Sequence, residues 1–155
     1  MGAIPIGKLL AVLIAGAALL AAPAASACTP LSVHFDWNSA DIPADSRRAI
    51  EQLAVRLAWN GPDVDHVLLT AHSDSSGSPA ANLRMAQRRA EAVRDLLVRN
   101  HVPARLIRIR SLGESALPVR TPRNVREPAN RRVDLLVQLS ARAQGVQLEE
   151  GRPIC

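Results

Sequence analysis

An aspartate and an arginine, Asp74 and Arg89, stand fifteen positions apart near the middle of this 155-residue chain. The segment after Asp74 is rich in serine and contains Gly77, which is typical of a loop, and Arg89 lies in the periodic apolar stretch that follows. A carboxylate on a loop and a guanidinium on the next helix can together form a pocket that carries both signs of charge. We expect such a pocket to bind a zwitterion, because each charge of the ligand would find a partner of opposite sign.

Strand and helix patterns alternate along the chain and must position this pair. Residues 31–35 alternate apolar and polar side chains, which predicts a half-buried strand, and Asp41-Ile42-Pro43 marks the start of a helix. This helix is predicted to end at Gly61-Pro62, and the apolar residues within 64–71 are typical of a buried central strand. That strand leads directly into the loop that carries Asp74.

The helix that carries Arg89 has the clearest pattern in the chain. Ser78 is expected to cap its first turn, with Pro79 at the first helical position, and the segment from Asn100 to Pro103 is expected to end it. Its apolar residues recur at spacings of three and four, which predicts one buried face. These residues are Leu83, Ala86, Ala90, Val93 and Leu97.

Two further strands are predicted at 106–110 and 133–139, and the segment between them, 111–130, is rich in Pro and Arg. We expect that segment to be an exposed, ordered loop with room for one short helix. Two successive strand-helix-strand units with the usual right-handed crossover predict an α/β sandwich. The expected architecture is one mixed sheet with helices packed on a single face.

Three motifs, in order along the chain, resemble the signature of the OmpA-like domain, the peptidoglycan-binding module of the OmpA, Pal and MotB type. The resemblance covers residues 31–139 and implies a βαβαβ(α)β fold. It also implies a non-catalytic domain that binds the cell wall and needs no cofactor. The matching residues are 33–40 for the first strand, 70–74 with Gly77, Asn82 and 89–93 for the central motif, and 130–135 for the last strand.

The resemblance also implies a ligand and the residues that bind it. Meso-diaminopimelate, the crosslinking residue of many stem peptides, carries an ammonium and a carboxylate on one carbon. Asp74 would accept from the ammonium, and Arg89 would hold the carboxylate through two parallel bonds. A structural role stays open for the other implied binding residues, as a turn residue for Asn82 and as salt-bridge partners for the rest. These residues are Asn82, Asn38, Arg131 and Arg132.

Four positions near the implied site depart from the family pattern. Ser73 stands where a threonine is usual, and Ala81 stands where an aromatic residue is common. Met85 and Glu127 are the other departures, and Glu127 lies before the last strand, where it could reshape one wall of the site. We expect these changes to affect affinity more than the identity of the ligand.

The first 27 residues have the features of a cleaved export signal. They combine the positive Lys8 with a short apolar stretch and a small-residue cleavage site at 25–27. Their removal would leave a single domain, 28–155, with its core at 31–139 and a C-terminal tail at 140–155. Export implies a location in the periplasm or at the outer membrane.

The exported part carries 18 arginines against 14 acidic residues, a net charge of +4. Arginine keeps its charge and its planar donor fork at any working pH, which suits partners rich in carboxylates, such as cell-wall peptides. Nucleic acid is a poor partner despite the basic balance. Single-strand binders stack bases on aromatic side chains, and this chain has one Phe, two Trp and no Tyr.

Two cysteines, Cys28 and Cys155, stand at opposite ends of the exported chain. The residues before Cys28 partly resemble a lipidation site, which would make the protein an outer-membrane lipoprotein. Lipidation would leave Cys155 as an odd thiol in an oxidising compartment, so we favour a disulfide between the two. Both alternatives stay open at this point.

An envelope hydrolase is the rival function, because serines cluster beside His72 and Asp74. No Gly-x-Ser-x-Gly motif is present, and adjacent loop residues rarely hold the geometry of a catalytic triad, so turn serines explain the cluster better. The histidines lack the spacing of metal ligands, and we expect no metal site. The serines are at 73, 75, 76 and 78, and the histidines are His34, His66, His72 and His101.

Overall fold

A computed structural model describes residues 30–59 and 63–140 of the chain. The predicted export signal, both cysteines and the tail beyond residue 140 lie outside the described residues. The strands are β1 (Leu31–His34), β2 (Val64–His72), β3 (Ile107–Gly113) and β4 (Arg132–Leu139). The helices are α1 (Ala44–Trp59) and α2 (Pro79–Arg99), and the 3-10 turns are η2 (Ala104–Leu106) and η3 (Pro128–Asn130).

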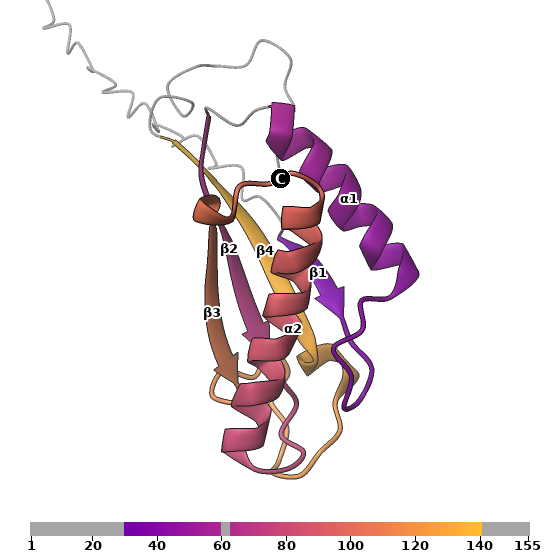
Figure 1. Cartoon of the computed structure of the whole chain (residues 1–155). Helices are drawn as coiled ribbons and strands as arrows, with labels where there is room; N and C mark the ends of the chain where they lie inside the picture. The colour runs from indigo at the N-terminus through magenta and orange to yellow at the C-terminus, as the bar shows by residue number, and fades with distance from the viewer. Residues whose placement is uncertain (1–29, 60–62, 141–155) are drawn as a thin grey trace, which may run out of the picture.

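The four strands form one mixed sheet in the order β1-β4-β2-β3. Strand β4 runs antiparallel to both of its neighbours, β1 and β2, while β2 and β3 are parallel and joined through α2. Both helices lie on the same face of the sheet, as Figure 1 shows. This arrangement confirms the predicted α/β sandwich with helices on one face.

The core lies between the helices and the face of the sheet that they cover. Alternate residues of β2, among them Val67, Leu69 and Ala71, are fully buried there. Helix α2 contributes the predicted stripe from Ala86 to Leu97, but Leu83 is 48% exposed. Among the described residues, no helix has the length and apolar character needed to cross a bilayer.

Several predicted boundaries differ from the observed ones, most clearly those of α1 and β3. Helix α1 begins at Ala44, after the predicted Asp41-Ile42-Pro43 start, because the Pro43 carbonyl accepts the first helical bond, from Arg47 N at 2.8 Å. Strand β3 begins one residue later and ends three residues further than predicted, at Gly113. Its pairing with β2 continues to the end of that strand, where His72 is the partner of Gly113.

The start of α2 is fixed against the end of β3. Ser78 caps the helix as predicted, accepting from Ala81 N at 3.3 Å, and Pro79 is the first helical residue. Ser111 Oγ donates to the Leu83 carbonyl at 3.1 Å. A Cβ on Gly113, which has a φ of +54°, would lie 3.0 Å from both Cα and N of Leu83. The backbones of helix and strand therefore meet at a glycine, and the Leu83 side chain points outward.

We predict that Gly113→Ala lowers the free energy of unfolding by about 2 to 4 kcal/mol, since a side chain there adds backbone strain and overpacks the first turn of α2. Gly77→Ala is the matched control. Gly77 also has a positive φ, +98°, but a Cβ there would meet only Asn82 Oδ1, at 3.9 Å. Urea unfolding of both variants measures the difference. Equal losses would show that the contact with α2 is unimportant.

Candidate functional site

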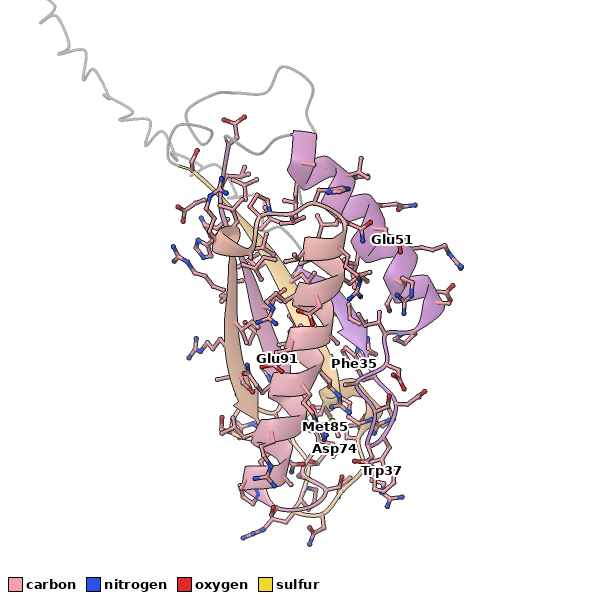
Figure 2. The ribbon with its side chains drawn as sticks, in the orientation of Figure 1. Phe35, Trp37, Glu51, Asp74, Met85 and Glu91 are labelled. Carbon is pink, nitrogen blue, oxygen red and sulfur yellow. The ribbon has the colours of Figure 1, made fainter. Side chains whose placement is uncertain are left out.

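An open pocket of about 840 Å³ lies beside the first turns of α2, against the loops that follow β1 and β2. Figure 2 shows Met85 of α2, Asp74 of the β2–α2 loop and Trp37 of the β1–α1 loop at this end of the molecule. The structure brings five of the six predicted binding residues to this pocket and leaves Arg132 outside its lining. The five are Asn38, Asp74, Asn82, Arg89 and Arg131.

Arg89 is the largest fully buried side chain among the described residues, with 1% of its surface exposed. It donates to three backbone carbonyls: from Nε to that of Ser39 at 2.9 Å, from Nη2 to that of Asp36 at 3.0 Å and from Nη1 to that of His72 at 3.5 Å. Its guanidinium also lies 5.3 Å from the centre of the Phe35 ring. Burial, and next the charge of Arg131, lower the pKa of Arg89 to about 10, so the side chain is still charged at neutral pH.

Asp74 is buried and bonded through both carboxylate oxygens. Its Oδ2 accepts from Arg131 Nη1 at 3.1 Å, and its Oδ1 accepts from Ser76 N at 3.2 Å and from Ser76 Oγ at 2.6 Å. Arg131 also donates from Nε to the Phe35 carbonyl at 3.0 Å. The ion pair of the pocket is therefore Asp74 with Arg131, a residue from the last motif, while Arg89 is held by backbone carbonyls.

The two asparagines of the pocket have different environments. Asn82 is buried, and its Nδ2 donates to Glu114, so its Oδ1 is the atom left on the side of Gly77 in the pocket wall. This pairing defines which end of the amide is the acceptor. Asn38 has a φ of 54°, a left-handed conformation that asparagine tolerates, at the turn after β1. Asn38 thus shapes the rim where the β1–α1 loop meets the pocket.

Arg132 lies on the face of the sheet that the helices leave open. Its Nε donates to Asp134 Oδ2 at 3.1 Å, two positions further along β4. Asp134 Oδ1 accepts from Ser32 Oγ at 2.5 Å, and His72 Nε2 lies 3.9 Å from Asp134 Oδ2. Arg132 therefore occupies the salt bridge that was the structural alternative for this residue.

The Ser73 hydroxyl is a feature of the pocket that the sequence did not reveal. Ser73 is 2% exposed, and its Oγ is the one buried side-chain polar atom without a hydrogen-bond partner in the described part of the chain. Since a buried polar group of this kind costs free energy, a group supplied by a ligand would remove that cost. Side chains alternate between the two faces along β2, so residue 73 faces the helices as Ala71 does. This alternation was the feature of the sequence that could have predicted a buried Ser73.

Two buried polar side chains order the β3–β4 loop: Ser75 bonds it to the β2–α2 loop, and Asn130 bonds two parts of it to each other. Ser75 Oγ donates to the Pro122 carbonyl at 2.6 Å and accepts from Val125 N at 3.2 Å. The Asn130 amide bonds to both backbone groups of Val119, each at 2.8 Å. The loop is therefore ordered by specific bonds, as predicted for this segment, and it holds Arg131 in place.

One wall of the pocket is built from Trp37. Trp37 is half exposed, and the Arg126 guanidinium lies over its ring, 3.8 Å from the ring centre. The Trp37 Nε1 donates to Ser76 Oγ at 3.4 Å. Glu127, which departs from the family pattern and was expected to reshape a wall of the site, accepts from Ala129 N at 3.0 Å and caps η3. The residue that contacts this wall is therefore Arg126, the neighbour of Glu127.

We predict that Asp74 and Arg131 are strongly coupled. Arg131→Gln leaves the Asp74 carboxylate buried and unpaired, so we expect a loss of about 3 to 5 kcal/mol in the free energy of unfolding. Adding Asp74→Asn removes the unpaired charge, and the double variant should lose less than the sum of the single losses. Urea unfolding of the four proteins measures this coupling. Additive losses would contradict a direct pair.

Ser73 and Ser75 provide a matched comparison of two buried hydroxyls. We predict that Ser73→Ala raises the free energy of unfolding by about 1 kcal/mol, because it removes an unpaired polar atom. Ser75→Ala should lower it by about 1 to 3 kcal/mol, because Val125 N and the Pro122 carbonyl lose their partner. Thermal or urea unfolding checks both signs. A loss at Ser73 as large as that at Ser75 would mean that the Ser73 hydroxyl is bonded.

Comparison with curated proteins gives relatives that are much longer than this chain. Outer membrane protein A of Yersinia pseudotuberculosis is 36% identical over 83 residues, which cover 54% of this chain and 24% of that protein. The chain therefore spans about a quarter of the length of this relative.

Among solved structures, the peptidoglycan-associated lipoprotein from Burkholderia pseudomallei superposes with a TM-score of 0.63 at 30% identity, over 69% of this chain and 89% of that one. The cell wall anchor of the T6SS from Pseudomonas aeruginosa shares the fold, with a TM-score of 0.55 at 24% identity over 70% and 80% of the two chains. The OmpA family matches residues 34–131, more than half of the sequence and every residue of the pocket. The chain therefore belongs to the OmpA family.

Proposed function

We propose that this domain binds peptidoglycan without cleaving it, by holding the zwitterionic end of meso-diaminopimelate in the pocket between Asp74 and Arg89. The observation that carries the proposal is a buried acid and a buried arginine in one open pocket, each with hydrogen-bonding capacity left over. A zwitterion can satisfy both, because it carries one charge of each sign.

The carboxylate of the ligand is assigned to Arg89. A guanidinium has five N–H donors, and the backbone carbonyls of three residues take three of them. One N–H on each terminal nitrogen is left, and these two can form the parallel bonds that carboxylates favour. The three carbonyls fix the plane of the guanidinium, so little conformational entropy is lost on binding.

The ammonium of the ligand is assigned to Asp74 and its neighbours. A carboxylate has about four acceptor positions, and Arg131 and Ser76 take three of those on Asp74. Ser73 Oγ and Asn82 Oδ1 are two further acceptors of the pocket lining. An ammonium with three N–H groups therefore has three candidate partners, of which one is charged.

The names of similar proteins support this function. The matching lipoprotein of Burkholderia pseudomallei is named for its association with peptidoglycan, and the Pseudomonas aeruginosa protein of the same fold is a cell wall anchor. We propose a tethering role in the Gram-negative envelope, in the periplasm or at the outer membrane, with envelope-complex proteins as further partners. The intact mass of the exported protein would separate lipidation at Cys28 from a disulfide with Cys155.

The hydrolase alternative finds little support in the loop that suggested it. His72 Nδ1 bonds to the Ala116 carbonyl at 2.8 Å, and His72 Nε2 is directed toward Asp134 on the open face of the sheet. Ser75 fastens the β3–β4 loop, and Ser76 donates to Asp74. Within the described residues, no serine of this loop is bonded to a histidine that could accept its proton.

We predict that Asp74→Asn and Arg89→Gln each weaken binding of a diaminopimelate-containing stem peptide about ten- to hundredfold, the cost of a lost charge-assisted contact. Calorimetric titration measures the affinity, and a pull-down with intact sacculi tests the natural polymer. Arg89→Lys should not restore binding. A lysine has fewer donors and an ordinary pKa of about 10.4, which burial would lower toward neutrality.

Asp45→Asn and Arg48→Gln are the controls for these variants, because this exposed pair lies on α1, outside the pocket lining. Circular dichroism must show folded protein. If Arg89→Gln fails to fold after losing its bonds to three carbonyls, the affinity of the Asp74→Asn variant tests the proposal. Wild-type affinity in a folded Asp74→Asn variant would end the proposal, and release of soluble wall fragments in the pull-down would favour the hydrolase.

A further inference from the structure

We propose that the same pocket recognises a second carboxylate of its ligand through Arg84 and Arg88, two exposed arginines at its rim. The inference rests on the proposed function, because the ligand is the same stem peptide. It adds a subsite and a selectivity: peptides with a free carboxylate at that position would bind more tightly than peptides in which it is an amide.

The first argument is the charge of the pocket lining. Four arginines and one acid line it, which gives a net charge of +3. Asp74, the acid, is already paired with Arg131 at 3.1 Å. Glu114 reaches the lining through its bond to Asn82 and reduces the surplus without removing it. The zwitterionic centre of diaminopimelate is neutral, so it leaves this positive surplus in place.

The second argument is that the rim arginines lack acidic partners. Within the described residues, the Arg84 side chain makes no hydrogen bond or ion pair, and the Arg88 side chain donates only to the Met85 sulfur, at 3.8 Å. Glu91, three positions after Arg88 on the same helix, accepts instead from Gln87 at 2.9 Å. On α1, by contrast, the exposed Arg48 pairs with Asp45. The guanidinium groups at the rim are therefore available to a ligand.

The third argument is position. Arg84 and Arg88 are one helical turn apart on α2, so their Cβ atoms are about 5 to 6 Å apart on one face. Arg88 directly precedes Arg89, the deep cation of the pocket. Arg84 and Arg88 both line the pocket and are both exposed, so they lie where its lining meets solvent, and a peptide bound at Arg89 also has to reach solvent. A carboxylate a few bonds from that centre would come within their reach.

Two carboxylates of a stem peptide have this chemistry. One belongs to the acidic residue that precedes diaminopimelate, and the other is the carboxylate at the end of the peptide. Both are planar anions that arginine can bind with two bonds. Exposure and the entropy of ordering a long side chain limit the gain, so we expect a selectivity of about three- to tenfold.

The experiment titrates the wild-type domain with three synthetic stem peptides: the free form, the form amidated at the acidic residue, and the form amidated at the end of the chain. We expect one amide to weaken binding about three- to tenfold, and the peptide affected identifies the source of the carboxylate. The variant Arg84→Gln/Arg88→Gln should bind the free peptide as weakly as the wild type binds that amide. It should also bind all three peptides equally and depend less on salt.

The double variant Arg47→Gln/Arg48→Gln is the control, because it also removes two positive charges, but from α1, outside the pocket lining. Wild-type selectivity in this control is the expected result. If it loses as much affinity as the rim variant, general electrostatic attraction explains the effect and the inference is overturned. Equal binding of all three peptides by the wild type overturns only this inference. No binding of any peptide overturns the proposed function as well.

Discussion

The structure of the site depends on one buried cation. Arg89 is bonded to carbonyls from the end of β2 and from two positions of the β1–α1 loop, so it joins three segments that are distant in the sequence. Carbonyl dipoles and the Phe35 ring stabilise its charge without neutralising it. The same contacts that stabilise the loops therefore leave a positive charge at the floor of the pocket, where an anionic group can approach.

The position of Asp74 follows from this cation. A second arginine, Arg131, lies close enough to lower the pKa of Arg89, and the Asp74 charge acts in the opposite direction. Asp74 pairs with Arg131 at 3.1 Å and so offsets one of the two buried positive charges. It keeps an acceptor position that Arg131 and Ser76 do not use. The acid thus has a structural role toward the protein and a proposed binding role toward the ligand, and the two roles use different lone pairs.

Much of the fold could be predicted from local patterns, and part of the site could be as well. Helical spacing places Asn82 and Arg89 on the buried stripe of α2 with Ala86 and Val93, and polar residues in such a stripe indicate a site. The pairing of Asp74 with Arg131 could not be predicted from spacing, because the two are 57 residues apart and meet only when β4 inserts between β1 and β2.

The outward position of Leu83 had a similar non-local cause. It follows from the close approach of Gly113 to the backbone of α2. The spacing of apolar residues within α2 cannot predict this contact, because Gly113 belongs to β3. The boundary of β3 likewise depended on how far β2 extends beside it. Local sequence therefore determined the elements, while contacts between elements determined which polar atoms of the pocket stay unpaired.

The lowered pKa of Arg89 connects stability with binding. Burial lowers its pKa in the fold to about 10, below the ordinary value for arginine, so the unfolded chain holds this proton more tightly. Ionised Arg89 therefore lowers the free energy of unfolding at neutral pH. This loss becomes smaller only as the pH rises above about 10, where the folded protein gives up the proton before the unfolded chain does. A carboxylate bound beside the Arg89 guanidinium favours the charged form of the arginine, so it offsets this loss of stability. Together with the unpaired hydroxyl of Ser73, this means that the pocket lining contains destabilising groups that a ligand of complementary charge would satisfy. A ligand that binds only the folded state stabilises the fold by mass action, so the proposed tether would be most stable while it is attached to the cell wall.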